Sequence, residues 1–150
     1  MKRIHKRFLI FGSIALVGIQ FIPADANKQV VIPDSDFRHE YDVPNNVMNI
    51  LESFCYDCHS NNTNYPWYSH IQPIRLMMDH HIEEGKEELN FSELGNYSKR
   101  RQKNKLKAII NQIKDDEMPL SSYTLIHSNA KLSEGEKKEI VKWFKTKLKD

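Results

Sequence analysis

The feature that most restricts what this chain can fold into is a pair of cysteines two residues apart, followed at once by a histidine. Cys55, Cys58 and His59 lie in the stretch FCYDCHSNNTNYPWYSH, and the chain of 150 residues has 2 cysteines in all. Because the two thiols are so close in sequence, they can be joined to each other or to one common group. The domain is therefore expected to be built around whatever these three side chains hold.

Three uses of this cysteine pair fit the sequence poorly. A thiol redox pair is typical of a helix N-terminus next to strands, whereas this motif follows a helical pattern. A structural zinc site needs four ligands, and no second cysteine pair is present, although His80, His81 and His127 are available. A disulfide across so short a loop would restrain little of the unfolded chain.

The segment Cys55-Tyr56-Asp57-Cys58-His59 matches the attachment motif of c-type haem in full. In that motif the two thiols add to the haem vinyl groups, and the adjacent imidazole binds the iron. The sequence therefore predicts one covalently attached haem c, held through Cys55 and Cys58, with His59 as the proximal iron ligand.

The start of the chain has the pattern of an export signal or a membrane anchor. The basic segment MKRIHKR precedes an uncharged apolar run from Phe8 to Ile22, which Pro23 closes. Residues 1–26 are therefore predicted to direct the domain to the periplasmic side of the cytoplasmic membrane. We expect residues 8–22 to remain as an anchor, with cleavage after Ala26 as the alternative, because Ala24-Asp25-Ala26 offers small residues at suitable spacing.

The charge distribution argues against a nucleic-acid partner. The formal net charge is +2, but residues 1–26 contribute four basic residues against one acidic residue, so the remainder of the chain is slightly acidic. The basic run SKRRQKNKLK, residues 98–107, is interpreted as the solvated face of a helix. Its functional alternative is a docking patch for an acidic redox partner protein.

Helical periodicity accounts for the rest of the chain. The stretch from Asn27 to Pro44 contains two prolines and no helical period, so residues 27–43 are predicted to form a linker before a domain of residues 44–150. Helices are expected over 47–54, from Pro73 to Gly85, over 106–113, and from the capping pair Ser133 and Glu136 to Leu148. No segment alternates as a strand does, which predicts an all-α fold with long loops.

Met118 is the predicted sixth ligand of the iron. It lies in a polar break between two helices, it precedes Pro119, and it does not belong to an apolar helical stripe. The alternatives are an open site and four histidines, His70, His80, His81 and His127.

Trp67 and Tyr68 follow the motif in an aromatic cluster. They could wall the haem, with the indole N–H or the phenol O–H as a donor, or they could fill the core behind the loop. Trp67 is predicted to be a pocket residue.

Four stretches, CYDCHSNNTNYPWYSHIQP, LNFSEL, DEMPLSSYTLIH and KLSEGEKKEIVKWF, resemble the bacterial haem-binding domain family, which is distantly similar to class I cytochromes c. The resemblance covers Val43 to Phe144. It implies a small cytochrome c-like helical domain around one haem, with thioether bonds at Cys55 and Cys58, an iron bond at His59 and Met118 as the distal ligand. It also implies that the N-terminal segment often remains as an anchor.

These patterns predict electron transfer by a single haem outside the cytoplasmic membrane, without enzymatic activity. No general base, nucleophile or second haem motif is recognised in the sequence. A haem-based sensor or gas-binding module, with an open or displaceable sixth position, is the alternative. A zinc-stapled interaction domain is the third interpretation.

Overall fold

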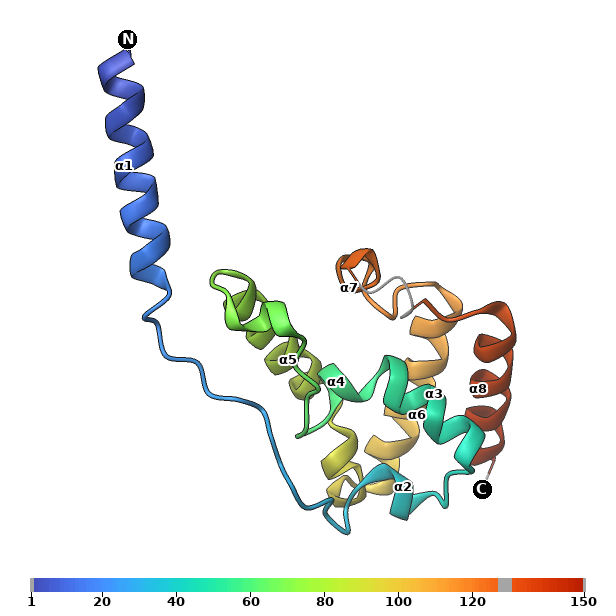
Figure 1. Ribbon diagram of the computed structural model, residues 1–150. Coiled ribbons are helices and arrows are strands. Elements are labelled where there is room, and N and C mark those ends of the chain that lie inside the picture. Colours follow the sequence, from blue (N-terminus) through green and yellow to red (C-terminus); the bar gives the residue numbers. More distant parts are fainter. Residues whose placement is uncertain (1, 127–130, 150) are drawn as a thin grey trace.

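The computed structural model describes residues 2–126 and 131–149, and the regular elements in these ranges are all helices, joined by loops (Figure 1). No strand occurs among the described residues, which contain a single isolated bridge between Lys28 and Asn62. The prediction of an all-α fold with an N-terminal helix is therefore confirmed. The helices, with 3-10 helices marked η, are α1 (Lys2–Ile19), α2 (Phe37–Glu40), α3 (Asn45–Phe54), α4 (Tyr56–His59), η1 (Trp67–His70), α5 (Ile74–Glu88), η2 (Phe91–Asn96), α6 (Lys99–Lys114), α7 (Ser121–Ile126) and α8 (Glu134–Lys147).

Helix α1 stands apart from the other helices, and an extended segment leads from its end to α2 (Figure 1). Its apolar side chains are exposed, for example Phe8 at 73% and Phe11 at 69%. The side-chain amide of Gln20 bonds the backbone of Gln72 twice, at 3.1 and 3.0 Å, and so ties the end of α1 to the loop before α5. Within the described residues, no helix has both the length and the apolar character needed to cross a bilayer.

The core lies where α3, α6 and α8 pack together with the segments around Phe37 and Phe91. Three phenylalanines are almost fully buried at its centre, with Phe37 and Phe91 ring centroids 5.2 Å apart and Phe37 and Phe144 centroids 5.8 Å apart. Helix α8 begins with the predicted capping box, in which the Ser133 and Glu136 side chains each bond the other residue's backbone N–H. The capping box fixes the start of α8, and Ile140 and Phe144 lie on the face of this helix that is buried in the core.

The structure differs from the expected linker over residues 27–43. Phe37 is completely buried in the core, and Asp36 is 2% exposed. The backbone of residues 27–29 pairs with the turn after α4, through the N–H groups of Gln29 and Thr63 at 2.9 Å each. This segment escapes sequence analysis because α2 has 4 residues, too few to show a helical period.

The prediction that α5 ends at Gly85 is wrong, and the helix continues to Glu88. A Cβ atom at this glycine would lie 2.8 Å from the backbone oxygen of Cys58. Gly85 is therefore a point of close approach between α5 and the motif helix α4, where any side chain would force the two helices apart.

Candidate haem site

A cavity of about 270 Å³ lies beside the histidine of the motif. Its wall is formed by the end of α3, the two ends of α4, residues 88–91, one face of α6, the loop after α6 and the segment before α8. Most of its side chains are apolar, and Glu88, Lys105 and Gln112 are polar. The lining residues are Phe54, Cys55, His59, Glu88, Leu89, Phe91, Lys105, Ala108, Ile109, Gln112, Ile113, Met118, Pro119 and Leu132.

His59 is oriented by two backbone carbonyls. Its Nδ1 lies 2.8 Å from the oxygen of Gly85 and 3.1 Å from the oxygen of Leu89. Because a carbonyl only accepts, Nδ1 carries the proton, which leaves the lone pair on Nε2. Burial lowers the pKa of His59, although the two carbonyl bonds oppose that shift, so the ring is neutral at pH 7. A neutral imidazole with one nitrogen held by a carbonyl is the form in which histidine binds a metal.

The cysteines of the motif lie on different sides of α4. Cys55 lines the same cavity as His59, whereas Cys58 borders a smaller pocket of about 50 Å³ together with Met78, His81 and other residues. The two thiols are free. Burial raises the pKa of Cys55 to about 12 and that of Cys58 to about 11, with smaller contributions from Cys58 and Asp57 respectively. Both thiols are protonated at pH 7 in this fold, which disfavours a thiolate redox pair.

Met118 is brought to the cavity by the turn that ends α6. Asp116 adopts a left-handed conformation, with φ of 57°, directly after the helix. The N–H groups of Glu117 and Met118 then both donate to the carbonyl of Gln112, at 3.0 and 3.3 Å. Lys137 of α8 pairs with the Asp116 carboxylate and secures the turn. Met118 and His59 therefore line one cavity although they are far apart in sequence.

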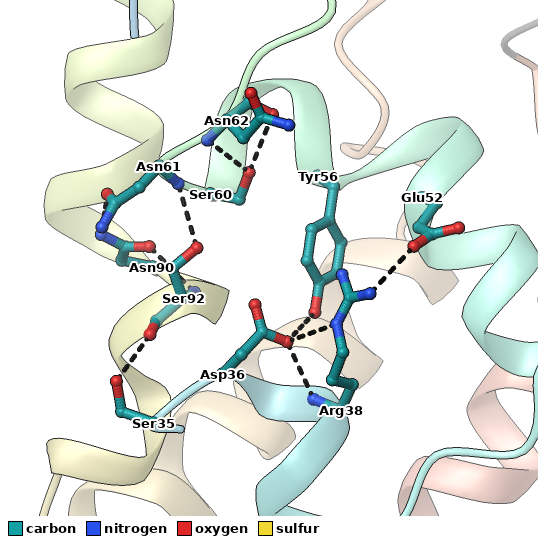
Figure 2. A network of polar contacts seen from close by, with 10 residues as sticks. All are labelled: Ser35, Asp36, Arg38, Glu52, Tyr56, Ser60, Asn61, Asn62, Asn90 and Ser92. Atoms are coloured by element: carbon teal, nitrogen blue, oxygen red, sulfur yellow. Dashed lines mark hydrogen bonds and ion pairs between the residues drawn. The ribbon is translucent and has the colours of Figure 1, made fainter. Parts of the chain in front are cut away.

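The motif helix is also held from behind by a polar network (Figure 2). The hydroxyl of Tyr56 donates to Oδ1 of Asp36 at 2.9 Å, and Arg38 donates to the same oxygen at 3.0 Å. The Tyr56 ring stacks on Phe91 at 5.0 Å, and Phe91 meets the His59 ring edge-on at 6.3 Å. Sequence analysis gave no role to Asp36 or Phe91, because their contacts to the motif join segments distant in sequence.

The other predicted residues lie away from this cavity. Trp67 is 77% exposed, packs against the Tyr68 ring at 5.8 Å, and is not among the lining residues. His70 is exposed, and His80 pairs with Glu84 at 3.3 Å. His81 borders the Cys58 pocket, and His127 lies outside the described residues. Among the residues that the structure describes, no group of three or more His, Cys, Asp or Glu side chains could hold a metal ion.

Sequence analysis missed the contribution of α6 to the cavity. Lys105, Ala108, Ile109 and Gln112 recur at helical spacing and line the wall beside the core stripe of Leu106, Ile110 and Ile113. The signal was present in the periodicity, as a second stripe next to the buried one. Lys105, predicted to be solvated, lies at this wall and is 3.6 Å from Glu88.

A comparison with protein families agrees with this geometry. The family model for a haem-binding domain matches residues 14–146, which is most of the chain. The chain belongs to this haem-binding family. The match begins within α1 and includes the segment that sequence analysis treated as a linker. No curated protein and no solved structure matches the chain.

The donor set of the cavity fits the group that the family binds. His59 offers an Nε2 lone pair, and Met118 offers a thioether sulfur from another part of the wall. Cys55 lines the same cavity, whereas Cys58 borders the separate smaller pocket. The apolar lining supplies the dry surroundings that a macrocycle requires.

Gly85→Ala tests whether the close contact between α5 and α4 orients His59. The added methyl group meets the Cys58 carbonyl at 2.8 Å, so we expect the free energy of unfolding to fall by about 1–3 kcal/mol. The shift of α5 should also loosen the Gly85 carbonyl from Nδ1 of His59 and broaden the optical bands of the bound haem. Denaturant unfolding and the absorption spectrum of the haem-loaded protein measure the two effects.

The matched control is Gly135→Ala in α8. A Cβ atom there meets nothing closer than 3.8 Å. The substitution should leave the spectrum unchanged and alter stability by less than about 1 kcal/mol, in the stabilising direction. Equal stability of the two variants would show that the contact at Gly85 can relax freely.

Proposed function

We propose that this protein binds one haem c covalently through Cys55 and Cys58 and transfers single electrons outside the cytoplasmic membrane. The observation that carries the proposal is the shared cavity of His59 and Met118 directly beside Cys55. Haem iron, when bound, supplies the one-electron oxidation and reduction. A nitrogen ligand paired with a thioether favours the reduced state, which suits a carrier.

The surrounding residues have separate roles in this proposal. The carbonyls of Gly85 and Leu89 hold the His59 ring, and they increase the electron density on Nε2 through their bonds to Nδ1. Leu89, Phe91 and Ile113 are buried and exclude water from the cavity. Lys105 offers a cation to the carboxylate groups of a macrocycle.

Carbon monoxide binding to the reduced protein tests the proposal against a haem-based sensor. A carrier with Met118 bound to the iron should react poorly with carbon monoxide, because the sixth position is filled. Rapid binding, seen as a shift of the main absorption band, would support the sensor and contradict the carrier. A colourless protein from cells with haem attachment machinery would contradict both and favour a zinc-stapled domain.

We also propose that the N-terminal segment keeps the protein at the membrane, because basic residues precede the apolar run of Phe8 to Ile22. The haem protein should sediment with membranes and be released by detergent but not by about 1 M salt. At that salt concentration the Debye length is about 3 Å, so interactions between charges are screened, whereas the burial of apolar side chains in the bilayer is unaffected. Cell fractionation followed by haem staining measures this. An N-terminus at Asn27 in the mature protein would show that the segment is removed.

The proposed partner is an acidic redox protein. Arg100, Lys103 and Lys107 are exposed on α6, and within the described residues none of them forms an ion pair. Such a basic face speeds the encounter with an acidic surface. The proposal includes no nucleic-acid partner.

A further inference from the structure

A second cavity, of about 310 Å³, lies on the opposite side of the Tyr56 ring from the haem cavity. Its roof is a strap of residues 29–33, which arches from Gln29 to Pro33. The strap is fixed at both ends, where the N–H of Gln29 donates to Asn61 at 2.9 Å and the carbonyl of Pro33 accepts from Asp36 at 2.9 Å. Between these ends Val30 is 97% exposed and Val31 is 73% exposed. The strap therefore covers the cavity while much of the surface of its apolar side chains faces solvent, and polar residues such as Asp36, Asn62 and Ser92 line the rest of the cavity.

The floor contains a buried carboxylate with one unused oxygen. Asp36 is 2% exposed, and its Oδ1 accepts from the backbone N–H of Arg38, from Nε of Arg38 and from the hydroxyl of Tyr56, at 3.0, 3.0 and 2.9 Å. Oδ2 accepts no hydrogen bond from any residue that the structure describes, and because no buried side-chain oxygen there lacks a partner, this atom is open to solvent. Figure 2 shows this second oxygen turned away from Arg38, between Tyr56 and Ser92, which also line the cavity.

The charges around this oxygen select a cation. The lining includes Asp36, Glu52 and Asp57 against one basic residue, Arg38, a net charge of −2. Arg38 is already neutralised by Asp36 at 3.0 Å and by Glu52 at 3.4 Å. An anion would find no free positive group here, whereas a cationic N–H group would both satisfy Oδ2 and offset the excess negative charge.

A metal ion and a single water fit the cavity less well than an organic cation. The described residues contain no group of three or more acidic, histidine or cysteine side chains placed to hold a metal ion. The volume of about 310 Å³ is roughly ten times the ~30 Å³ that one water occupies in the liquid, and it falls in the range of small-molecule pockets.

We propose that this cavity binds a small organic cation, with an ammonium or guanidinium group on Oδ2 of Asp36 and an aliphatic body beneath Val31 and Ile32. The site does not depend on the proposed electron transfer, because the stacked rings of Tyr56 and Phe91 separate it from the haem cavity. It nevertheless adjoins the motif helix through Tyr56. An occupant would complete the hydrogen bonding of the carboxylate that holds this helix.

Calorimetric titration of the full-length haem-loaded protein tests the proposal with four probes, each of which has an unbranched chain of four carbon atoms. These are n-butylammonium, butylguanidinium, 1-butanol and butyrate. We expect both cations to bind, 1-butanol to bind at least about tenfold more weakly, and butyrate not to bind, since the charge-assisted bond to Oδ2 provides the difference. Absence of cation binding, or equal binding of 1-butanol, would overturn the proposal and leave a cavity filled by water only.

Variants locate the binding. Asp36→Asn keeps an oxygen for Arg38 and Tyr56 but removes the charge at Oδ2, so cation affinity should fall by about tenfold or more. The Glu52 side chain is 49% exposed, so Glu52→Gln should cause a smaller loss of cation affinity. If Asp36→Asn does not fold, this variant tests whether the cation binds in the cavity. The control Glu117→Gln makes the same charge change in the loop before Met118 and should leave the affinity unchanged. Equal losses in Glu52→Gln and Glu117→Gln would refute a site beneath the strap.

Discussion

Replacement of Cys55 and Cys58 together by alanine should remove all haem that survives acid–acetone extraction, while the wild-type protein keeps its colour and gains the mass of one haem. The reason is that the two sulfurs are the only atoms proposed to bond the macrocycle covalently. Each single variant should retain at most one thioether bond. Absorbance and intact mass after extraction measure the result.

The double cysteine variant should also lose much of its stability. The haem proposed to fill the cavity of about 270 Å³ would then lose its covalent attachment and could dissociate, which exposes the apolar cavity wall to water. Because a domain of this size is stable by only about 5–15 kcal/mol, we expect a lower midpoint of denaturant unfolding than in the haem-loaded wild-type protein. Met78→Leu, next to Cys58 but without effect on the thiols, is the control and should retain the haem. Extraction of the wild-type colour into the solvent would contradict covalent attachment.

Met118→Ala should abolish the weak far-red absorption band that a sulfur ligand gives to oxidised haem. It should also lower the reduction potential and allow the reduced protein to bind carbon monoxide. The physical reason is that a thioether binds ferrous iron better than ferric iron, so its loss removes stabilisation of the reduced state. Optical spectra, redox titration and carbon monoxide binding measure the three effects.

Met77→Ala is the matched control for this change. Met77 is 59% exposed on α5 and does not line the haem cavity, so its loss should leave band, potential and carbon monoxide reactivity as they are. If the wild-type band is absent and Met118→Ala behaves like Met77→Ala, the sixth ligand is another residue. His81, His70 and His127 are then the next substitutions to make.

Sequence reasoning succeeded where the signal is local. The capping pair of Ser133 and Glu136 predicted the start of α8, and apolar periodicity predicted α3, α6 and α8. The motif predicted a haem-binding protein, and the family comparison confirms that level of the prediction. Each of these signals lies within a few turns of one helix, so it can be read without knowledge of the packing.

Predictions from the sequence were wrong where a residue's role depends on a segment distant in sequence. Phe37 belongs to the core because Phe91 and Phe144 surround it, and nothing within residues 27–43 indicates this burial. Gly85 was interpreted as a helix stop, which is the commoner local meaning of a glycine, whereas its lack of Cβ admits the backbone of Cys58. The placement of Trp67 in the haem pocket stays a prediction, and its side chain is 77% exposed on η1.

The sequence by itself determined which groups the chain offers to a haem, namely two thiols, an imidazole and a thioether, because these follow from residue identity. Only the tertiary structure decided how they are presented. The carbonyls of Gly85 and Leu89 accept the hydrogen bonds of Nδ1 of His59 and so leave the lone pair of Nε2 free. The turn at Asp116 brings Met118 to the same cavity. The strap and the buried Asp36 form a second cavity in the same way. Hydrogen-bond directions and cavity walls are made by segments distant in sequence, so they exist only once the chain has packed.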